Sequence, residues 1–317
     1  MKTEDTVVVV GSGMMGSGIG AMAALAGRRT ILTDLSADRA RSGWDRAASC
    51  VRLREENGLA CAQQARRALS LLEFQGDVER AVKGASLVIE AISEDLSAKQ
   101  GLFLRLDALL SPDVPICSNT SGLQITQIAA LCQHPERTMT THFWLPAHLV
   151  PLVEVVMGVH TREEIARQVM EELKTWDKSP VLVRKDLPGQ LANRIFQAII
   201  REAVDIVASG LASPEDVDTA ISCGMAMRFP EWGPLTHLDA IGLPLGLRVQ
   251  EAVLPSICAS RHAGGYLREL VDQGKLGVSA GEGFYDWRKR DIQQDMEKRD
   301  RFIIEAVKLK ERLDRMG

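Results

Sequence analysis

Short apolar runs alternate with helix-forming stretches from the start of the chain. Thr6–Val10 is a continuous β-branched run, and Arg29–Thr33 is a second candidate strand. Runs that are apolar at successive positions predict strands covered on both faces, as in a parallel sheet. Between them, Ser17–Ala26 is rich in Ala, Met, Leu and Ile, which predicts a buried helix that ends at Gly27.

The alternation continues to about residue 183 and predicts the fold class. Further strands are expected at Ala85–Ile92, Pro115–Ser118, Met139–Phe143, Pro151–Val156 and Pro180–Val183, with helices at Leu96–Leu110 and Arg162–Trp176. The charged stretch Ser36–Leu72, broken near Glu56-Asn57-Gly58, predicts a helical hairpin inserted between strands. Elements in this order predict an α/β fold of the Rossmann type, with a doubly wound, mainly parallel sheet.

The pattern changes at Asp186-Leu187-Pro188-Gly189. Beyond it strand-like runs cease, and helical patterns dominate from Gln190 to about Gly274. We therefore expect a Rossmann domain at 1–187, an all-α domain at 188–287 and a charged helical tail at 288–317. The tail has apolar residues at helical spacing, so we expect it to pack on its own subunit or on a partner instead of a membrane. These residues are Phe302, Ala306, Leu309, Leu313 and Met316.

Composition excludes several classes of protein. The chain has 317 residues, of which 45% are hydrophobic and 25% charged, and a net charge of -4, so no basic field favours nucleic acid or an acidic membrane surface. The sequence has no run of about 18 apolar residues, so we expect no membrane span. The first residues lack the pattern of a secretory signal. The six cysteines form no close pair, so we expect free thiols in the cytoplasm, with neither disulfides nor a metal site. They are Cys50, Cys61, Cys117, Cys132, Cys223 and Cys258.

A glycine-rich loop follows the first strand and opens the first helix. It reads Gly11-Ser12-Gly13-Met14-Met15-Gly16. In that context the glycines permit a tight turn, a close approach to a pyrophosphate and close packing of helix on strand. Asp34 ends the second strand, where a carboxylate accepts hydrogen bonds from the adenosine ribose and repels a 2'-phosphate. The loop predicts NAD as cofactor, in preference to NADP; the alternative is a flavodoxin-like fold with a chance glycine loop.

His142 and Glu154 are candidates for proton transfer. His142 follows Met139-Thr140-Thr141 at the end of a strand, and Glu154 lies in the next extended segment. Oxidation of an alcohol needs a base near pH 7, and a carboxylate behind a histidine holds its tautomer and stabilises the imidazolium. A strand-end histidine can equally be structural, and the chain has five others: His134, His148, His160, His237 and His262.

Several motifs, in order, resemble the L-3-hydroxyacyl-CoA dehydrogenase family over residues 6–287. They are VVVVGSGMMGSGIG, LVIEAISED, SNTSGLQITQIA, HFWLP with PLVEVV, KDLPGQLANR, GPLTHLDAIGL and LGVSAGEGFYDW. Relatives of the family include carnitine dehydrogenase, L-gulonate 3-dehydrogenase (lambda-crystallin) and a pyridine-alcohol dehydrogenase of vitamin B6 breakdown.

The resemblance implies roles for individual residues. His142 and Glu154 would form the catalytic pair, and Ser121 and Asn193 would lie beside substrate and nicotinamide, where neutral groups bind oxygens without changing the charge of the base. The alternatives are a turn serine and a helix-capping asparagine. The family likeness also brings two further residues, Glu94 and Lys99, near the cofactor, although they could form an ordinary solvated pair. It further implies a homodimer formed through the helical domain.

Three departures from the family pattern concern ligand binding. Leu145 stands where the family's HFFNP motif has an asparagine that contacts the nicotinamide end, and Ser279 stands where the family often has a lysine. In the hairpin, CoA-binding members carry a lysine-rich helix. Here CVRLREENG offers Arg52 and Arg54 followed by the acidic pair Glu55-Glu56. These changes leave the dehydrogenase prediction intact and weaken the prediction of an acyl-CoA substrate.

The leading expectation is NAD-dependent oxidation of the 3-hydroxyl of a 3-hydroxyacyl-CoA, or the reverse reduction. His142 would take the hydroxyl proton. The alternative substrate is a small free hydroxy acid or alcohol, as in the carnitine, gulonate and pyridine branches. A non-catalytic NAD(H)-binding structural protein is the remaining alternative; it would leave the set His142, Glu154, Ser121 and Asn193 without a use.

Overall fold

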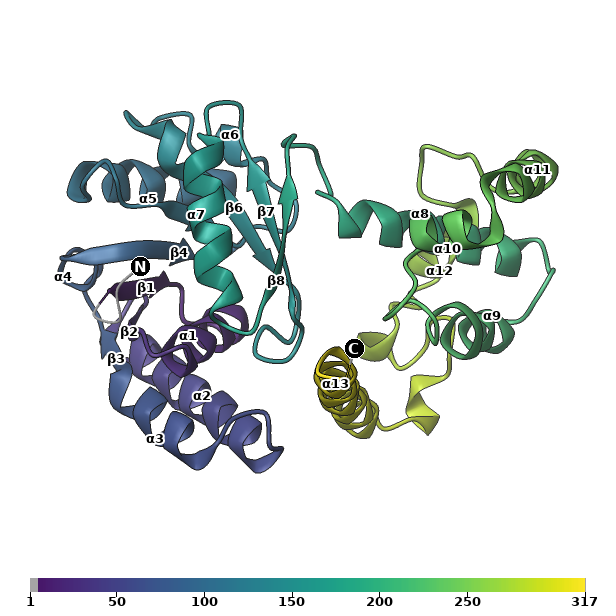
Figure 1. The fold of residues 1–317 in the computed structure, drawn as a ribbon. Coiled ribbons are helices and arrows are strands. Elements are labelled where there is room, and N and C mark those ends of the chain that lie inside the picture. Colours follow the sequence, from purple (N-terminus) through teal and green to yellow (C-terminus); the bar gives the residue numbers. More distant parts are fainter. Residues whose placement is uncertain (1–4, 317) are drawn as a thin grey trace. The chain divides into compact units, whose positions relative to one another are not determined.

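The computed structural model describes residues 5–316, which form two compact units (Figure 1). The first unit contains the chain up to Leu191 together with Ile303–Lys308. The second contains Ala192–Phe302 and the residues from Leu309 onward. All eight strands of the sheet lie in the first unit, whereas the elements that begin after Leu191 are helical.

The first unit is built on one eight-stranded sheet. Its strands are β1 (Thr6–Val10), β2 (Arg29–Thr33), β3 (Leu72–Gln75), β4 (Ala85–Glu90), β5 (Ile116–Ser118), β6 (Thr138–Phe143), β7 (Leu152–Met157) and β8 (Ser179–Val183). They are ordered β3-β2-β1-β4-β5-β6-β7-β8. Every neighbouring pair is parallel except the antiparallel pair β6–β7. From β1 the chain adds β2 and β3 on one side and then β4 to β8 on the other, which confirms the predicted doubly wound sheet.

Helices cover both faces of this sheet. They are α1 (Met14–Leu25), α2 (Ala37–Glu56), α3 (Ala62–Leu71), α4 (Val78–Ala81), α5 (Leu96–Leu109), α6 (Ile125–Ile128), the 3-10 turn η1 (Pro135–Arg137) and α7 (Glu163–Lys174). Helices α2 and α3 lie side by side as the predicted hairpin, and α2 packs on α1 (Figure 1). Ser36 caps α2 by accepting a hydrogen bond from the Arg39 N–H, which fixes where the hairpin begins.

Burial in β1 explains its run of four consecutive valines. Val7 and Val9 belong to the apolar cluster on one face of the sheet, with α1, α2 and α7. Val8 and Val10 belong to the cluster on the other face, with α5 and α6. Because successive side chains of a strand point to opposite faces, a strand between two helical layers can be apolar at consecutive positions. The continuous valine run was interpreted correctly.

Two details differ from the predicted elements. β3 was missed, since the predicted hairpin ran to Leu72, where the strand LEFQ begins. It is an edge strand bonded only to β2, so its side chains are mostly exposed and its sequence lacks an apolar run. Helix α1 also begins at Met14, earlier than the predicted Ser17, because it starts immediately after Gly13 of the glycine loop.

The second unit is all-α in its described residues, apart from single β-bridges around Glu282. Its elements are α8 (Ala192–Ala208), α9 (Pro214–Ala220), the π-turn η2 (Ile221–Met225), α10 (Pro234–Ile241), α11 (Leu243–Val253), η3 (Leu254–Ser256), α12 (Gly265–Asp272), η4 (Val278–Ala280), η5 (Trp287–Lys289) and α13 (Ile292–Asp314). The tail is therefore helical over most of its length, as its spacing predicts, and its middle residues belong to the first unit.

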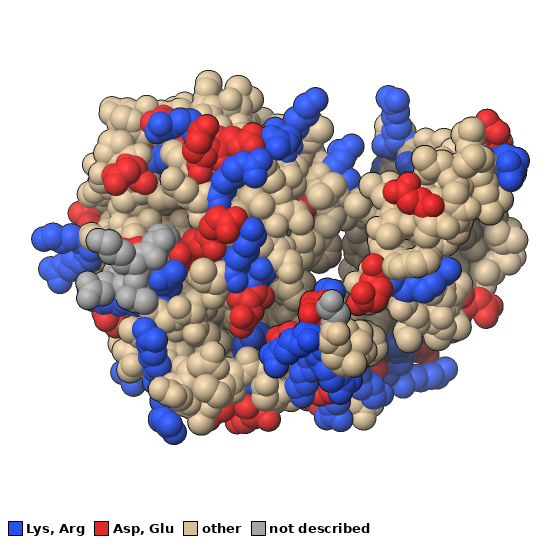
Figure 2. All heavy atoms as spheres, in the orientation of Figure 1, with Lys and Arg blue, Asp and Glu red and all other residues tan. Residues whose placement is uncertain are grey.

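The surface carries charges of both signs. Lys and Arg are interspersed with Asp and Glu on the visible face of each unit (Figure 2). Among residues 5–316, no helix is both long enough and apolar enough to cross a membrane.

Candidate active site

The glycine loop between β1 and α1 is shaped by the space around each glycine. Gly11 has φ +95°, and a Cβ there would lie 2.6 Å from the Ala91 carbonyl. A Cβ on Gly16 would collide with the Gly11 carbonyl oxygen, whereas one on Gly13 would meet no atom within 4 Å. The first and third glycines therefore serve the fold, and the second leaves the backbone open to a pyrophosphate at the start of α1. Of the next two residues, Met14 is largely exposed and Met15 is half-buried.

Asp34 stands at the carboxyl end of β2, beside this loop. Its Oδ2 accepts hydrogen bonds from the Ser12 N–H (2.8 Å) and hydroxyl (3.0 Å), and its Oδ1 accepts from the Leu35 N–H (2.8 Å). Burial raises the pKa of the Asp34 carboxyl, but these hydrogen bonds outweigh it, so the net shift is downward and the group is ionised at neutral pH. A carboxylate is thus held where the ribose of a dinucleotide is expected.

A pocket of about 640 Å³ adjoins Asp34. Its walls come from the carboxyl ends of β1, β2 and β4 and from α5, and include Val10, Thr33, Gly76, Ile92 and Leu102. An apolar slot with a carboxylate at its rim fits an adenosine. The pattern of the sequence did not identify Leu102 or Gly76, because they reach the pocket only through the folding of distant segments.

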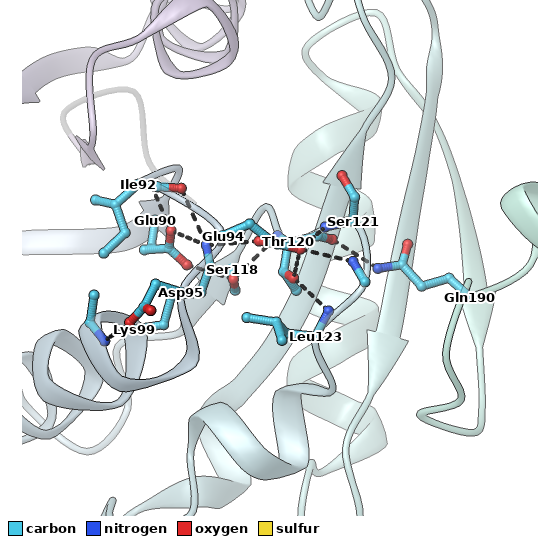
Figure 3. A network of polar contacts seen from close by, with 12 residues as sticks. Glu90, Ile92, Glu94, Asp95, Lys99, Ser118, Thr120, Ser121, Leu123 and Gln190 are labelled. Carbon is cyan, nitrogen blue, oxygen red and sulfur yellow. Dashed lines mark hydrogen bonds and ion pairs between the residues drawn. The ribbon is translucent and has the colours of Figure 1, made fainter. Parts of the chain in front are cut away.

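Glu94 holds the loop that carries Ser121 (Figure 3). Its Oε1 accepts hydrogen bonds from the Thr120 hydroxyl (2.6 Å), the Ser121 N–H (3.0 Å) and the Gly122 N–H (2.9 Å). Burial raises the pKa of Glu94, but these hydrogen bonds lower the pKa by more, so the pKa of Glu94 lies below its usual range. Ser121 itself is exposed at the carboxyl end of β5, beside the loop that follows β4.

Lys99 lies beneath the same loop in a buried cluster. Its ammonium is 2.6 Å from Glu90 and 3.5 Å from Glu94. Glu90 also accepts from the Ser118 hydroxyl (2.5 Å) and the Ile92 N–H (2.6 Å), and neither Glu90 nor Lys99 is exposed by more than 1%. These contacts brace the loops after β4 and β5. Contact of Lys99 with the cofactor stays a prediction. Sequence reasoning missed Glu90, although a glutamate that ends an apolar strand was a usable signal.

His142 and Glu154 lie opposite each other on β6 and β7. His142 Nδ1 is 2.9 Å from Glu154 Oε2, which also accepts from the Trp144 indole N–H at 3.1 Å. The second carboxylate oxygen accepts from the Leu191 N–H at 2.8 Å. Glu154 is fully buried and His142 is 6% exposed. Because a carboxylate accepts from Nδ1–H, the neutral imidazole keeps its lone pair on Nε2, which bonds to none of the residues in the range 5–316.

The four predicted catalytic residues come from both units. Asn119 connects Ser121's loop to the histidine segment, since its side-chain oxygen accepts from the Phe143 N–H at 2.8 Å. His142, Glu154 and Ser121 all belong to the first unit. Asn193 begins α8 in the second unit, so its approach to His142 stays a prediction.

The arginines of the hairpin differ in their surroundings. Arg54 is buried, pairs with Asp177 at 3.1 Å and donates to the His148 carbonyl at 2.9 Å. These contacts hold the Arg54 guanidinium within the fold. Arg52 is exposed, but so is Glu56, while Glu55 is half-buried. Of the other two departures, Leu145 is 48% exposed, and Ser279 lies in η4, where its hydroxyl donates to the Leu276 carbonyl.

Two family models match consecutive parts of the chain. The first, described as 3-hydroxyacyl-CoA dehydrogenase, NAD binding domain, matches residues 6–187. The second, described as 3-hydroxyacyl-CoA dehydrogenase, C-terminal domain, matches residues 189–287. The chain belongs to the 3-hydroxyacyl-CoA dehydrogenase family. As a member of that family it is an NAD-dependent dehydrogenase that acts on a CH–OH group, and the flavodoxin-like alternative is excluded.

Relatives within the 3-hydroxyacyl-CoA dehydrogenase family differ in substrate. A probable 3-hydroxybutyryl-CoA dehydrogenase of Bacillus subtilis is 35% identical over 285 residues, covering 90% of this chain and 98% of that protein. A 5-formyl-3-hydroxy-2-methylpyridine 4-carboxylate 5-dehydrogenase of Mesorhizobium japonicum is 29% identical over 308 residues, covering 96% and 98%. The crystal structure of an enzyme of the latter name, described as an NAD+-dependent dismutase, has a TM-score of 0.89 at 28% identity and covers 97% of this chain and 99% of its own.

Proposed function

We propose that this enzyme oxidises the hydroxyl group of a small polar molecule that carries no CoA, with NAD as the hydride acceptor. The observation that carries the proposal is the buried ion pair of Arg54 with Asp177. It removes one of the two cations that the hairpin segment CVRLREENG could have offered to the phosphates of CoA.

The charges on that segment are unsuited to a nucleotide. CoA brings several phosphate groups, which proteins bind with Arg and Lys. With Arg54 turned inward, the exposed Arg52 is accompanied by two glutamates, Glu55 and Glu56. Their negative charges would repel the phosphates of CoA, although salt weakens this repulsion. The repulsion favours a smaller ligand without these phosphates.

The extent of the likeness to the pyridine carboxylate enzyme also supports the proposal. The crystal structure of an enzyme of that name matches this chain with a TM-score of 0.89 and covers 97% of it. A structural likeness this close over nearly the whole chain is a further resemblance to that branch.

The residues of the first unit suit the proton transfer of such a reaction. His142 Nε2 would take the hydroxyl proton while the C–H electron pair leaves with its hydrogen, so that the C–O single bond becomes a carbonyl. NAD supplies the acceptor for that hydride. The Glu154 carboxylate, 2.9 Å from Nδ1, stabilises the imidazolium that forms, and the N–H groups of Trp144 and Leu191 keep the carboxylate in place. Ser121 and Asn193 would bind the reacting oxygen and neighbouring polar groups.

A 3-hydroxyacyl-CoA is the second candidate substrate. The observation in its favour is the 35% identity with the Bacillus subtilis relative, which exceeds the 29% identity with the pyridine carboxylate enzyme. The same base and carboxylate would serve either reaction.

An assay of NADH formation tests the proposal. The substrates are 3-hydroxybutyryl-CoA, free 3-hydroxybutyrate, carnitine, gulonate and pyridine alcohols with a ring carboxylate, and the control is the His142→Gln variant. We expect turnover with a free acid or alcohol and none with the CoA ester. Turnover of the CoA ester with a micromolar KM, lost in the His142→Gln variant, would establish the second candidate instead.

A further inference from the structure

Gln190 carries a buried hydrogen-bond acceptor without a partner. The residue is 6% exposed, and its Nε2 donates to the Thr120 carbonyl at 2.9 Å. Since a carbonyl can only accept, the amide orientation is fixed and the oxygen is the free end. Oε1 has no partner in the described part of the chain, and in Figure 3 it points away from the Thr120 loop. Such an atom costs stability unless something binds it.

The backbone of Gln190 is also in an unfavourable conformation. Its φ is +53°, in the left-handed region that residues with a Cβ rarely adopt. It follows Gly189, whose φ is +79°. Three hydrogen bonds hold the conformation: the Gln190 side chain donates to the Thr120 carbonyl, its N–H donates to the Leu187 carbonyl, and the N–H of the next residue, Leu191, donates to Glu154. Strain of this kind persists where the surroundings require a particular side-chain position, and it concentrates at binding sites.

These bonds locate Gln190 at one end of the dinucleotide site. In a doubly wound sheet the dinucleotide lies across the carboxyl ends of the strands. Asp34 and the pocket beside it mark the adenosine end at β2, and the glycine loop marks the pyrophosphate at β1. The nicotinamide half then lies over the ends of β4 and β5, which carry Glu94 and Thr120. Gln190 is bonded to this loop and precedes the residue that bonds the catalytic carboxylate.

We infer that Gln190 Oε1 accepts a hydrogen bond from the carboxamide N–H of the nicotinamide. The carboxamide is the donor that a nicotinamide ring offers, and the ring must come close to His142 for hydride transfer. The inference rests on the proposed function in one respect, namely that hydride transfer requires the nicotinamide ring to lie beside His142. The bond would fix which face of the ring is turned to the substrate, so Gln190 would be a cofactor-orienting residue.

Measurements of cofactor binding to the full-length protein test the proposed hydrogen bond of Gln190 without any substrate. The ligands are NADH, its reduced 3-acetylpyridine analogue, which has a methyl ketone in place of the carboxamide, and ADP-ribose, which lacks the ring. The variants are Gln190→Met and, as a matched control, Gln124→Met. Gln124 also donates from its side-chain amide to a backbone carbonyl, that of Asp186 at 2.6 Å, but its amide oxygen is not a buried acceptor without a partner.

We expect the native protein to prefer NADH over the analogue, and Gln190→Met to reduce that preference about 3- to 10-fold, the range for one hydrogen bond. ADP-ribose affinity should stay unchanged, and Gln124→Met should keep the preference. An unchanged preference in Gln190→Met, or an equal loss of affinity for all three ligands, overturns the inference. If no alcohol is oxidised but these affinities behave as expected, the proposed substrate class fails and the role of Gln190 stands.

Discussion

His142 and Glu154 face each other across the antiparallel strands β6 and β7 as a register pair, with 2.9 Å between Nδ1 and Oε2. Both side chains therefore extend from strands of the sheet and not from loops. A site built on such elements is held in its working geometry before ligands bind.

Replacement of His142 by Gln should leave NADH binding intact and lower turnover by about 100-fold or more, the range for loss of a general base. The glutamine fills a similar space but cannot take a proton. Isothermal calorimetry with NADH and steady-state kinetics with the true substrate check the two halves. Near-normal turnover in the variant would show that another group is the base.

Replacement of Glu154 by Gln should change the pH dependence as well as the rate. The amide removes the negative charge that favours the imidazolium, so the acid limb of the profile for alcohol oxidation should move to lower pH. Rates at a series of pH values, with the variant's fold checked by circular dichroism, provide the test. A lower rate with an unmoved acid limb would assign Glu154 a purely structural role.

Much of the fold was predictable because its signals are local. The valine run of β1 directly indicates a strand that is covered on both faces, and the glycines after it indicate a tight turn. Edge strand β3 lacks that signal, because half of its environment is solvent. The predicted end of the Rossmann domain at residue 187 stays a prediction, although the structure divides the chain at Leu191.

The pairing of His142 with Glu154 was predictable because the two residues lie in adjacent extended segments, and the glycine loop was predictable because it directly follows a strand. Residues that act through distant partners were missed. Gln190 meets Thr120 across 70 positions, and Arg54 meets Asp177 across 123. No pattern around Arg54 shows that its side chain turns inward, because that depends on a partner in the turn between α7 and β8.

Asp34→Ala should narrow the preference for NAD(H) over NADP(H) by about tenfold, since it removes a charge-assisted ribose acceptor and the repulsion of a 2'-phosphate. Asp34 also accepts from Ser12, so ADP-ribose affinity should be measured to account for loosening of the loop. Calorimetry with both cofactors decides the matter. Equal affinities in the native protein would remove Asp34 from the cofactor site.

Lys178 should make stability rise with pH. Burial, with a smaller effect from Arg54, lowers the pKa of Lys178 to about 7, while Asp177 opposes the shift. Between about 7 and the pKa of an unfolded lysine, about 10.4, the unfolded chain binds a proton that the folded chain does not. The free energy of unfolding then rises with pH, by at most about 1.4 kcal/mol per unit.

Urea titrations of the native protein and Lys178→Met at pH 7.5, 8.5 and 9.5 isolate this effect, because other groups titrate in both. The ammonium donates to the carbonyls of Ala147 (2.5 Å) and Val150 (2.9 Å), so the variant also loses these bonds at every pH. We expect the free energy of unfolding of the native protein, minus that of the variant, to increase with pH. A constant difference would mean that the lysine does not lose its proton in this range.

The helical unit should form a homodimer. Leu235, Leu247 and Val249 are 76%, 59% and 50% exposed on α10 and α11, and such apolar surface favours burial against a second copy. Light scattering at micromolar concentration should report twice the monomer mass, and Leu247→Glu should reduce it. Gln63→Glu, on the exposed face of α3, is the control. A 34.7 kDa species in the native protein contradicts the prediction.

The three donors gathered by Glu94 have a consequence for how quickly the site can work. Thr120, Ser121 and Gly122 are bonded to its carboxylate in the folded chain itself. The conformational entropy of that loop is therefore lost during folding and not when a ligand arrives. Each catalytic cycle can begin with the loop already in place, and the binding energy of the nicotinamide and the alcohol stays available for their alignment.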